Sequence, residues 1–416
     1  MNIFEISSIL VSISASLMYV NFRFLKLPMT IGLMLLSLIF SFFIFSMGFF
    51  VPQIHLFTSS VIGNIDFNIT LMGGMLSFLL FAGSLHVDLN DLFEQKVIIS
   101  ILATLGVVFS TLLVGTITYY VLALFGININ YIYCLLFGSL ISPTDPIAVL
   151  GLLKETNSPK SLKTTIAGES LFNDGVGVVV FTVILTILSG GSHISISEIS
   201  FLFIEEAVGG IVFGLIIGYI FFKLLKSVDN YPLEIMLTLA LVMGGYSLAS
   251  HLHLSGPLAM VVAGLFIGNH GKMFAMSETT HKQLFSFWEL IDEFLNALLF
   301  VLIGFEVLVI SFNFNYLITA TLLIPLILLV RYIAITIPLK IMGDKTNLSK
   351  GSAVVMTWCG LRGGISIALA LSLPESSEKS VIIAITYVVV AFSILVQGLT
   401  AKKVVNRMDF SLTNKK

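Results

Sequence analysis

The sequence predicts an all-α protein that crosses a lipid bilayer many times, and three observations carry this prediction. Apolar residues make up 57% of the 416 residues and charged residues only 11%, whereas a soluble domain carries roughly 25% charged residues. The apolar residues fall in runs close to the length of about 20 residues that a membrane helix needs. The charged residues lie mainly between these runs. The two cysteines lie within them, which argues against a disulfide framework or a cysteine metal site.

Thirteen apolar segments are candidate membrane spans. The first has no basic stretch before it and further spans follow it, so we expect a span there rather than a cleavable signal peptide. Together the spans form a single transmembrane domain over residues 1–416, with a short tail at 406–416. The expected spans are 3–21, 27–48, 70–86, 97–124, 129–152, 163–189, 203–224, 233–250, 255–269, 286–311, 315–339, 350–373 and 380–401, and the tenth is expected to begin as an interfacial helix.

The basic residues indicate the orientation of the chain. With thirteen spans and an external N-terminus, all but three of the 21 lysines and arginines fall on the inner side. The exceptions are Lys379 in an outer segment and Arg331 and Arg362 within spans. Because cytoplasmic segments carry the excess of Lys and Arg, we expect a multi-pass protein of the cell membrane with its N-terminus outside and its C-terminus in the cytoplasm.

Two of the spans are interrupted. Pro143 and Pro146 break the span at 129–152, because proline lacks a backbone N–H and constrains the residue before it. Glycines surround Arg362 in the span at 350–373 and loosen that helix as well. A broken helix at membrane depth is tolerated only where it is packed within protein or lines a watery cavity.

The order of the spans predicts an inverted repeat. Spans one to six would form a first half at about residues 1–190, and spans eight to thirteen a second half at about residues 232–405. A connecting helix at about residues 201–227 gives the halves opposite orientations, so that each interrupted span is the fifth of its half. A matched pair of interrupted helices is a sequence indicator of the binding site of a secondary transporter.

Three carboxylates lie inside apolar segments, and each is a functional candidate because a charge is costly to place in hydrocarbon. They are Asp145, Glu169 and Asp174. Ser170 and Asp174 are four residues apart and share one helix row, while Glu169 and Asn173 share the next row. We expect the first row to face an ion and Glu169 to face a buried arginine.

The break at Thr144-Asp145 would free backbone carbonyls and a hydroxyl, and such oxygens suit a monovalent cation. If the three carboxylates are ionised, the two mid-span arginines, Arg331 and Arg362, leave one negative charge over. One cation or one proton would neutralise it. A carboxylate that accepts either ligand, but not both at once, makes an exchanger by competition.

Three motifs occur in order along the chain. They are Ser142-Pro143-Thr144-Asp145-Pro146, Gly168-Glu169-Ser170-Leu171-Phe172-Asn173-Asp174-Gly175 and Gly360-Leu361-Arg362-Gly363-Gly364. In these motifs, and over nearly its whole length, the sequence resembles the monovalent cation/proton antiporter family, in the branch of bacterial NhaP-type and animal NHE-type sodium/proton exchangers. The resemblance implies a thirteen-span inverted-repeat fold, a homodimer, and a mobile core domain that moves against a dimerisation domain.

The resemblance also implies roles for the ion ligands. Asp174 would be the central carboxylate that binds Na⁺ or H⁺. Asp145, Ser170 and Thr144 would complete the shell around the transported cation. The Asn173-Asp174 pair resembles the electroneutral branch, since electrogenic relatives commonly carry two aspartates there.

Four further residues would support the site. Glu169 would pair with Arg331, and Asn173 would stabilise the crossing of the two broken helices. Arg362 would either lie near the ion or neutralise helix ends at the break. In one departure, Ala82 stands where many relatives carry an acid, which leaves the pH-activation behaviour open.

We therefore expect a secondary transporter that exchanges a monovalent cation, first of all Na⁺, for H⁺, electroneutrally, for pH and sodium homeostasis. A K⁺/H⁺ antiporter is the alternative, with Li⁺ as a further possible cation. A cation channel or a symporter is less favoured, because a pair of broken helices around one shared carboxylate fits alternating access better than a continuous pore. We expect no enzymatic activity, no cofactor and no nucleic-acid partner.

Overall fold

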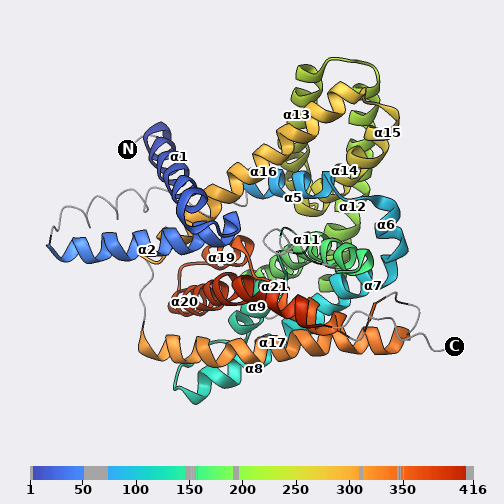
Figure 1. Cartoon of the computed structure of the whole chain (residues 1–416). Coiled ribbons are helices and arrows are strands. Elements are labelled where there is room, and N and C mark those ends of the chain that lie inside the picture. Colours follow the sequence, from blue (N-terminus) through green and yellow to red (C-terminus); the bar gives the residue numbers. More distant parts are fainter. Residues whose placement is uncertain are drawn as a thin grey trace.

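The protein is described by a computed structural model of residues 3–50, 74–145, 158–190, 196–308, 313–343 and 351–408, with the isolated positions 151, 153, 156, 346, 348 and 349 (Figure 1). Within these ranges every regular element is helical. The α-helices are α1 Ile3–Val20, α2 Met29–Phe50, α5 Leu76–Leu85, α6 Leu89–Glu94, α7 Lys96–Ile101, α8 Val107–Leu124, α9 Tyr131–Ile141, α11 Lys160–Gly190, α12 Ile196–Lys226, α13 Tyr231–His251, α14 Gly256–Phe266, α15 Lys272–Phe274, α16 Glu278–Glu306, α17 Phe314–Met342, α18 Ser352–Trp358, α19 Gly364–Leu371, α20 Ser377–Phe392 and α21 Gly398–Arg407. Single π-helical turns are η1 Asn21–Leu25, η3 Leu102–Gly106, η4 Ile267–Gly271 and η6 Ser393–Gln397.

The predicted membrane-spanning architecture is confirmed. In the described part of the chain, 8 helices are long and apolar enough to cross a membrane, and two shorter apolar helices, α5 and α9, accompany them. Each of the thirteen expected segments overlaps a helix. The predicted span residues 70–73, 146–150, 152, 309–311 and 350, and most of the predicted tail, lie outside the described residues.

Two short stretches add to the expected spans. Helix α6 lies between the third and fourth expected spans and begins after Asp88, whose Oδ1 accepts the backbone N–H of Asn90 at 2.8 Å and caps it. The helix of the tenth span, α16, is continuous from Glu278, so it begins before the predicted start of the span at residue 286. Its first turns pack inward through Trp288, whose ring lies 4.7 Å from that of Phe81.

The helices form two packed groups (Figure 1). In one group α5 packs on α14 and α16, α12 packs on α13 and α14, and α2 packs on α16. In the other, α8 packs on α9 and α17, and α20 packs on α17 and α19. Helix α11 lies between the groups, in contact with α9 on one side and with α12 and α14 on the other. This position matters because α11 carries half of the predicted site residues, namely Glu169, Ser170, Asn173 and Asp174.

Helix α9 is held by an unusually close contact with α8. A Cβ atom on Gly138 would collide with the backbone carbonyl of Thr111, and one on Gly115 would lie 2.9 Å from the carbonyl oxygen of Cys134. Small residues let membrane helices approach to backbone contact in this way. The contact fixes α9, which ends at the predicted break.

We predict that Gly138→Ala destabilises the protein although alanine is the better helix former. The added methyl must push the backbones of α8 and α9 apart, and overpacking of this kind costs about 1–3 kcal/mol. The melting temperature of the purified protein in detergent should fall by several degrees. The matched control is Gly244→Ala in α13, where a Cβ would meet nothing within 4 Å. Equal melting temperatures for the two variants would contradict the argument.

Candidate functional site

The two interrupted helices cross each other at their breaks. Helix α9 ends at Ile141 and α18 ends at Trp358, and the chain continues in each case as a short extended stretch. The stretches meet in one antiparallel bridge, in which the backbone N–H of Asp145 donates to the carbonyl of Leu361 at 2.8 Å. Backbone groups that a helix would have satisfied internally are therefore satisfied by the other break.

Glycines make room for this crossing. The ring of Pro143 lies against α11 at Gly177, where a Cβ would overlap it. A Cβ on Gly363 would lie 2.8 Å from the Cβ of Asp145, and one on Gly360 would lie 3.0 Å from Nε of Arg331. Larger residues at these three positions would push the breaks apart.

Arg362 binds the open end of α9. Its guanidinium donates from one nitrogen to the carbonyls of both Ser142 and Pro143, at 2.8 Å each. The carbonyl end of a helix carries partial negative charge, so the buried guanidinium neutralises it. Arg362 was expected either to lie near the ion or to neutralise helix ends at the break. Its hydrogen bonds to the end of α9 are those of a group that neutralises a helix end.

The second break is supported by η6, which the sequence reading did not single out. The hydroxyl of Ser393 accepts the backbone N–H of Arg362 at 2.9 Å. The amide of Gln397 donates to the carbonyl of Trp358, the last residue of α18, at 3.0 Å. Two polar side chains four residues apart in an apolar span are the signal that could have found them.

Thr144 joins the first break to α11. Its backbone N–H donates to Oδ1 of Asn173 at 3.2 Å, and Nδ2 of Asn173 donates back to its hydroxyl at 3.0 Å. The same hydroxyl lies 3.0 Å from Oγ of Ser170. Ser170 and Asn173, expected on rows with different tasks, therefore both face the break, because one turn of α11 is wide enough to contact Thr144 through neighbouring rows.

Glu169 and Arg331 form an ion pair between α11 and α17. The carboxylate oxygen Oε1 accepts from a terminal guanidinium nitrogen, and the side chains are only 1% and 8% exposed. Nε of Arg331 has no hydrogen-bond partner within the described residues. The ion pair links α11 to α17. Because each charge is neutralised by its partner, neither side chain presents an uncompensated charge to a transported ion.

Asp174 and Asp145 are the carboxylates that remain. Asp174 lies one turn beyond Ser170 on α11 and is 7% exposed, whereas Asp145 follows Thr144 and is partly exposed. The two carboxylates repel each other electrostatically, and Arg362 attracts Asp174. The structure thus gathers two carboxylates and the hydroxyls of Ser170 and Thr144 at the crossing. All four groups offer oxygen atoms that can act as cation ligands.

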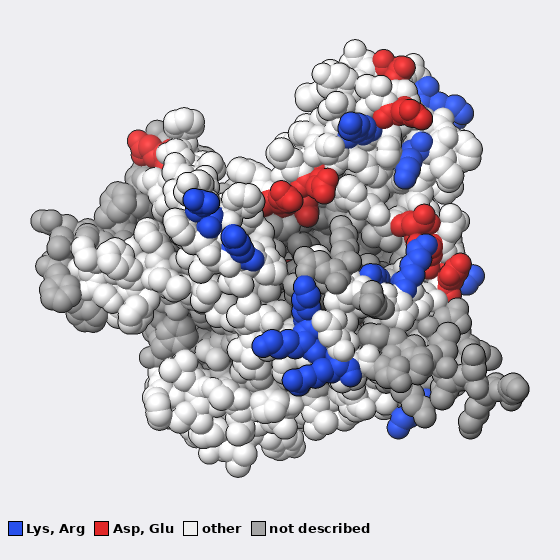
Figure 2. Space-filling model, in the orientation of Figure 1, with Lys and Arg blue, Asp and Glu red and all other residues white. Residues whose placement is uncertain are grey.

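A cavity of about 650 Å³ lies along the middle of α16, and one of the acids that line it, Asp292, is close enough to Asp145 for the two carboxylates to repel each other. Figure 2 shows acidic side chains gathered over α16 at the edge of a central hollow, with basic side chains on its other sides. The cavity is lined by Lys26, Leu27, Pro28, Met29, Thr30, Leu33, Gly151, Glu289, Asp292, Glu293, Asn296, Ala297 and Lys402.

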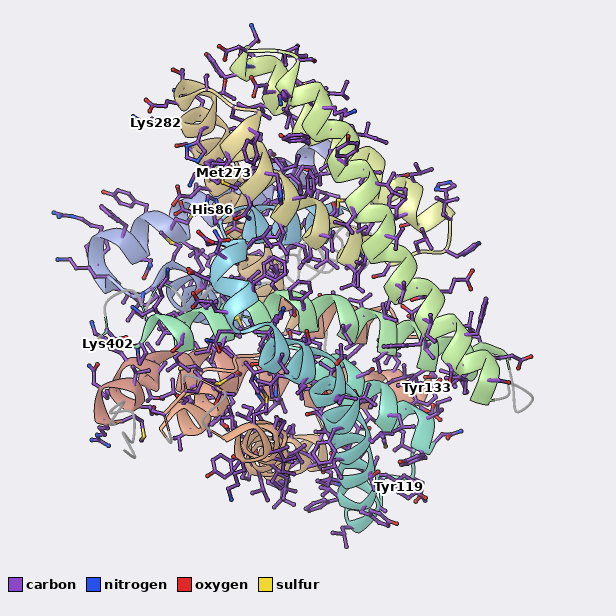
Figure 3. All side chains as sticks on the ribbon, turned by 90° about the vertical axis from the view of Figure 1, so that its right-hand side faces the viewer. His86, Tyr119, Tyr133, Met273, Lys282 and Lys402 are labelled. Atoms are coloured by element: carbon purple, nitrogen blue, oxygen red, sulfur yellow. The ribbon has the colours of Figure 1, made fainter. Side chains whose placement is uncertain are left out.

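The two faces of the molecule carry different residues. In Figure 3, Lys282 and Lys402 lie on one side, and Tyr119 and Tyr133, at the ends of α8 and α9, lie on the other. The cavity lies on the lysine side, since Lys402 is among the residues that line it.

We predict that Glu169→Ala lowers thermal stability more than Ser170→Ala. Removing one partner of a buried ion pair leaves the other charge uncompensated, which costs about 3–5 kcal/mol, while one lost hydroxyl contact costs on the order of 1 kcal/mol. A double variant that exchanges the charges, Glu169→Arg with Arg331→Glu, should recover part of the loss. Melting temperatures of the purified proteins measure all three, and equal values for the two single variants would count against the pair.

Comparisons with known proteins show the family to which the chain belongs. The sodium/hydrogen exchanger, transmembrane family matches residues 10–407. The Na(+)/H(+) antiporter NhaP of Pseudomonas aeruginosa is 48% identical over 405 residues, which cover 96% of this chain and 95% of that protein. The Na(+)/H(+) antiporter NhaH of Halobacillus aidingensis is 36% identical over 83% of this chain and 84% of that protein.

The fold is that of a solved structure as well. The sodium proton antiporter MjNhaP1 from Methanocaldococcus jannaschii, determined at pH 8, superimposes with a TM-score of 0.74 at 20% identity, covering 96% of this chain and 97% of that one. Family match, close relatives and fold all span nearly the whole chain, and the chain therefore belongs to the sodium/hydrogen exchanger family.

Proposed function

We propose that this protein exchanges Na⁺ for H⁺ across the cell membrane and that Asp174 is the carboxylate that binds either one. The observation that carries the proposal is the burial of Asp174 beside Asp145 at the crossing of two broken helices. The family match and two relatives named as Na(+)/H(+) antiporters support the choice of ions.

The cation ligands are oxygens from both elements. Asp174 and Ser170 come from α11, and Asp145 and Thr144 come from the break after α9. Hard cations prefer such carboxylate and hydroxyl oxygens. Selectivity among Na⁺, Li⁺ and K⁺ depends on the distances between the cation and its oxygen ligands. Transport experiments on this protein should therefore compare all three cations.

The charges around the site favour one cation for one proton. Glu169 and Arg331 neutralise each other. Arg362 is engaged with the carbonyl end of α9 but also offsets one of the two remaining carboxylates. A single negative charge is then left at Asp174 and Asp145, which one Na⁺ or one H⁺ neutralises. Binding by competition gives the carrier the same charge with either ligand.

Alternating access follows from the two helix groups. The breaks, α9 and α17 belong to the group that would move, and α12 to α14 with α16 and α2 to the group that would stay. Helix α11 lies between the groups and would move with the first, because Ser170 and Asn173 contact Thr144 of the first break. The two inverted repeats at about residues 1–190 and 232–405, with the connector at about 201–227, supply the two related arrangements. The homodimer that the resemblance implies belongs to the same proposal.

The orientation is assigned from the basic residues. Lys26, Lys282 and Lys402 share the face on which the cavity lies. Because Lys and Arg accumulate on the cytoplasmic side, this face is the cytoplasmic one, with the N-terminus outside and the C-terminus inside. The cavity is then the path between the cytoplasm and Asp174.

We predict that Asp174→Asn abolishes exchange and leaves expression and dimerisation intact, because asparagine keeps the shape of the side chain and loses its proton and charge chemistry. The assay is cation-induced dequenching of a pH dye in everted vesicles, scanned over Na⁺, Li⁺, K⁺ and pH. Exchange by the variant at the wild-type rate would show that Asp174 is not the carrier.

We predict that exchange is electroneutral and competitive. Where the site is mostly protonated, the apparent KM for Na⁺ should rise about tenfold per unit fall in pH, since each bound proton removes one Na⁺ site, while Vmax changes little. A net moved charge would be driven by about 2.3 kcal/mol per 100 mV, so an electroneutral rate ignores a potassium–valinomycin potential in proteoliposomes. A severalfold change with the sign of that potential would require a second titrating group, with Asp145 examined first.

A further inference from the structure

The acids of α16 have no part in the exchange as proposed above. Glu289, Asp292 and Glu293 occupy little more than one turn in the wall of the cavity, and Lys26 and Lys402 line it as well. An acidic rim on the route to a cation site raises the local concentration of cations. If attraction of cations were their only role, the three acids would contribute equally to transport. Their surroundings in the structure differ, however.

Asp292 differs from the other two because it has a partner one turn deeper. Nδ2 of Asn296 donates to the backbone carbonyl of Asp292 at 2.8 Å and to its Oδ1 at 3.1 Å. Asn296 is only 3% exposed and lines the cavity. Its own Oδ1 is buried and has no hydrogen-bond partner among the residues that the structure describes.

An unpaired buried amide oxygen is costly, and here it lies beside a carboxylate. The amide hydrogens of Asn296 are turned toward Asp292, so the oxygen is the atom left over. A carboxylate oxygen and an amide oxygen are both ligands for hard cations. The residue pair thus offers what a partly hydrated monovalent cation needs.

Asp292 is also close enough to the exchange site to feel its charge. Its carboxylate and that of Asp145 repel each other electrostatically. In contrast, Glu289 and Glu293 are exposed. A cation on Asp292 would relieve the repulsion between these two carboxylates.

We propose that Asp292 and Asn296 form a waiting site for the transported monovalent cation, which keeps part of its water shell there before it passes to Asp145 and Asp174. The proposal rests on the proposed function, since it concerns the cytoplasmic route to that exchange site. The cation is bound weakly, because two protein ligands and water replace only part of a hydration shell. Asp292 and Asn296 are positioning residues for transport rather than members of the exchange site.

The test uses Asp292→Asn and Asn296→Ala in the full-length protein, with Na⁺ as the probe. Asp292→Asn keeps the side-chain shape and an oxygen that can still accept from Asn296. Everted vesicles present the cytoplasmic face to added Na⁺, and right-side-out vesicles present the other face. Each variant should raise the apparent KM for Na⁺ at the cytoplasmic face about fivefold, the order expected for loss of one hydrogen-bond-strength ligand, with Vmax and the KM at the outer face unchanged.

Two controls separate a waiting site from general attraction. Glu278→Gln removes one charge from the same helix at an exposed position outside the cavity and should leave both KM values unchanged. Glu289→Gln removes a charge from the rim and should act weakly, and its effect should disappear when choline chloride screens the rim. The effects of Asp292→Asn and Asn296→Ala should persist at high choline chloride.

Several outcomes would overturn the waiting site. One is an unchanged cytoplasmic KM in both variants while the wild type exchanges normally. Another is an Asp292→Asn effect that equals that of Glu289→Gln and vanishes with salt. A third is loss of Vmax at both faces with an unchanged melting temperature, which would place Asp292 in the exchange step itself. Failure of the proposed function is distinct, since the wild type would then show no Na⁺-dependent proton flux.

Discussion

The structure depends on two broken helices that satisfy each other. A helix interrupted in a bilayer leaves carbonyl and N–H groups without partners, and each such group is costly where no water is present. Here the backbone of Asp145 bonds to Leu361, and the guanidinium of Arg362 binds the carbonyl end of α9. Neither break is stable without the other, so the site exists only in the folded crossing. That is why the two breaks that meet at the site come from segments more than 200 positions apart.

The second constraint is charge. Three carboxylates could not remain ionised together in this volume without compensation, and the protein provides it in two different ways. Arg331 is tied to Glu169 as a pair between helices, whereas Arg362 faces a helix end and still attracts Asp174. The first arrangement stabilises the fold around α11. The second leaves one carboxylate able to change its ligand, which is the property that exchange needs.

Much of this could be predicted from the sequence, and the remainder has a physical reason. Pro143 and the glycines around Arg362 predict the breaks, because their effect on the backbone is local. A carboxylate in an apolar segment predicts a site, because the energetic cost of placing a charge there also depends only on the local sequence. What a side chain contacts is not local. The helix period placed Asn173 on a different row from Ser170, yet both bond to Thr144, since the period defines a face but not the width of the element that packs on it. The hydrogen bond from Arg362 to Ser393 in η6 and the pairing of Asp292 with Asn296 could not be predicted from the sequence for the same reason.

The cavity and the close contacts between helices also bear on how access to the site could change sides. On the side of the molecule that carries Lys402, the middle of α16 lines the cavity. Farther along α16, the hydroxyls of Ser37 and Ser41 bond to the carbonyls of Phe300 and Gly304, so α2 and α16 pack without a gap. The contacts within each helix group are of this close kind, down to backbone contact between α8 and α9. Bending either group would break them, whereas sliding one group past the other would not. If exchange proceeds as proposed, the motion that moves Asp174 from one face to the other is therefore a rigid displacement at the boundary between the groups, and α11, which contacts both, is the element that must carry the ion across it.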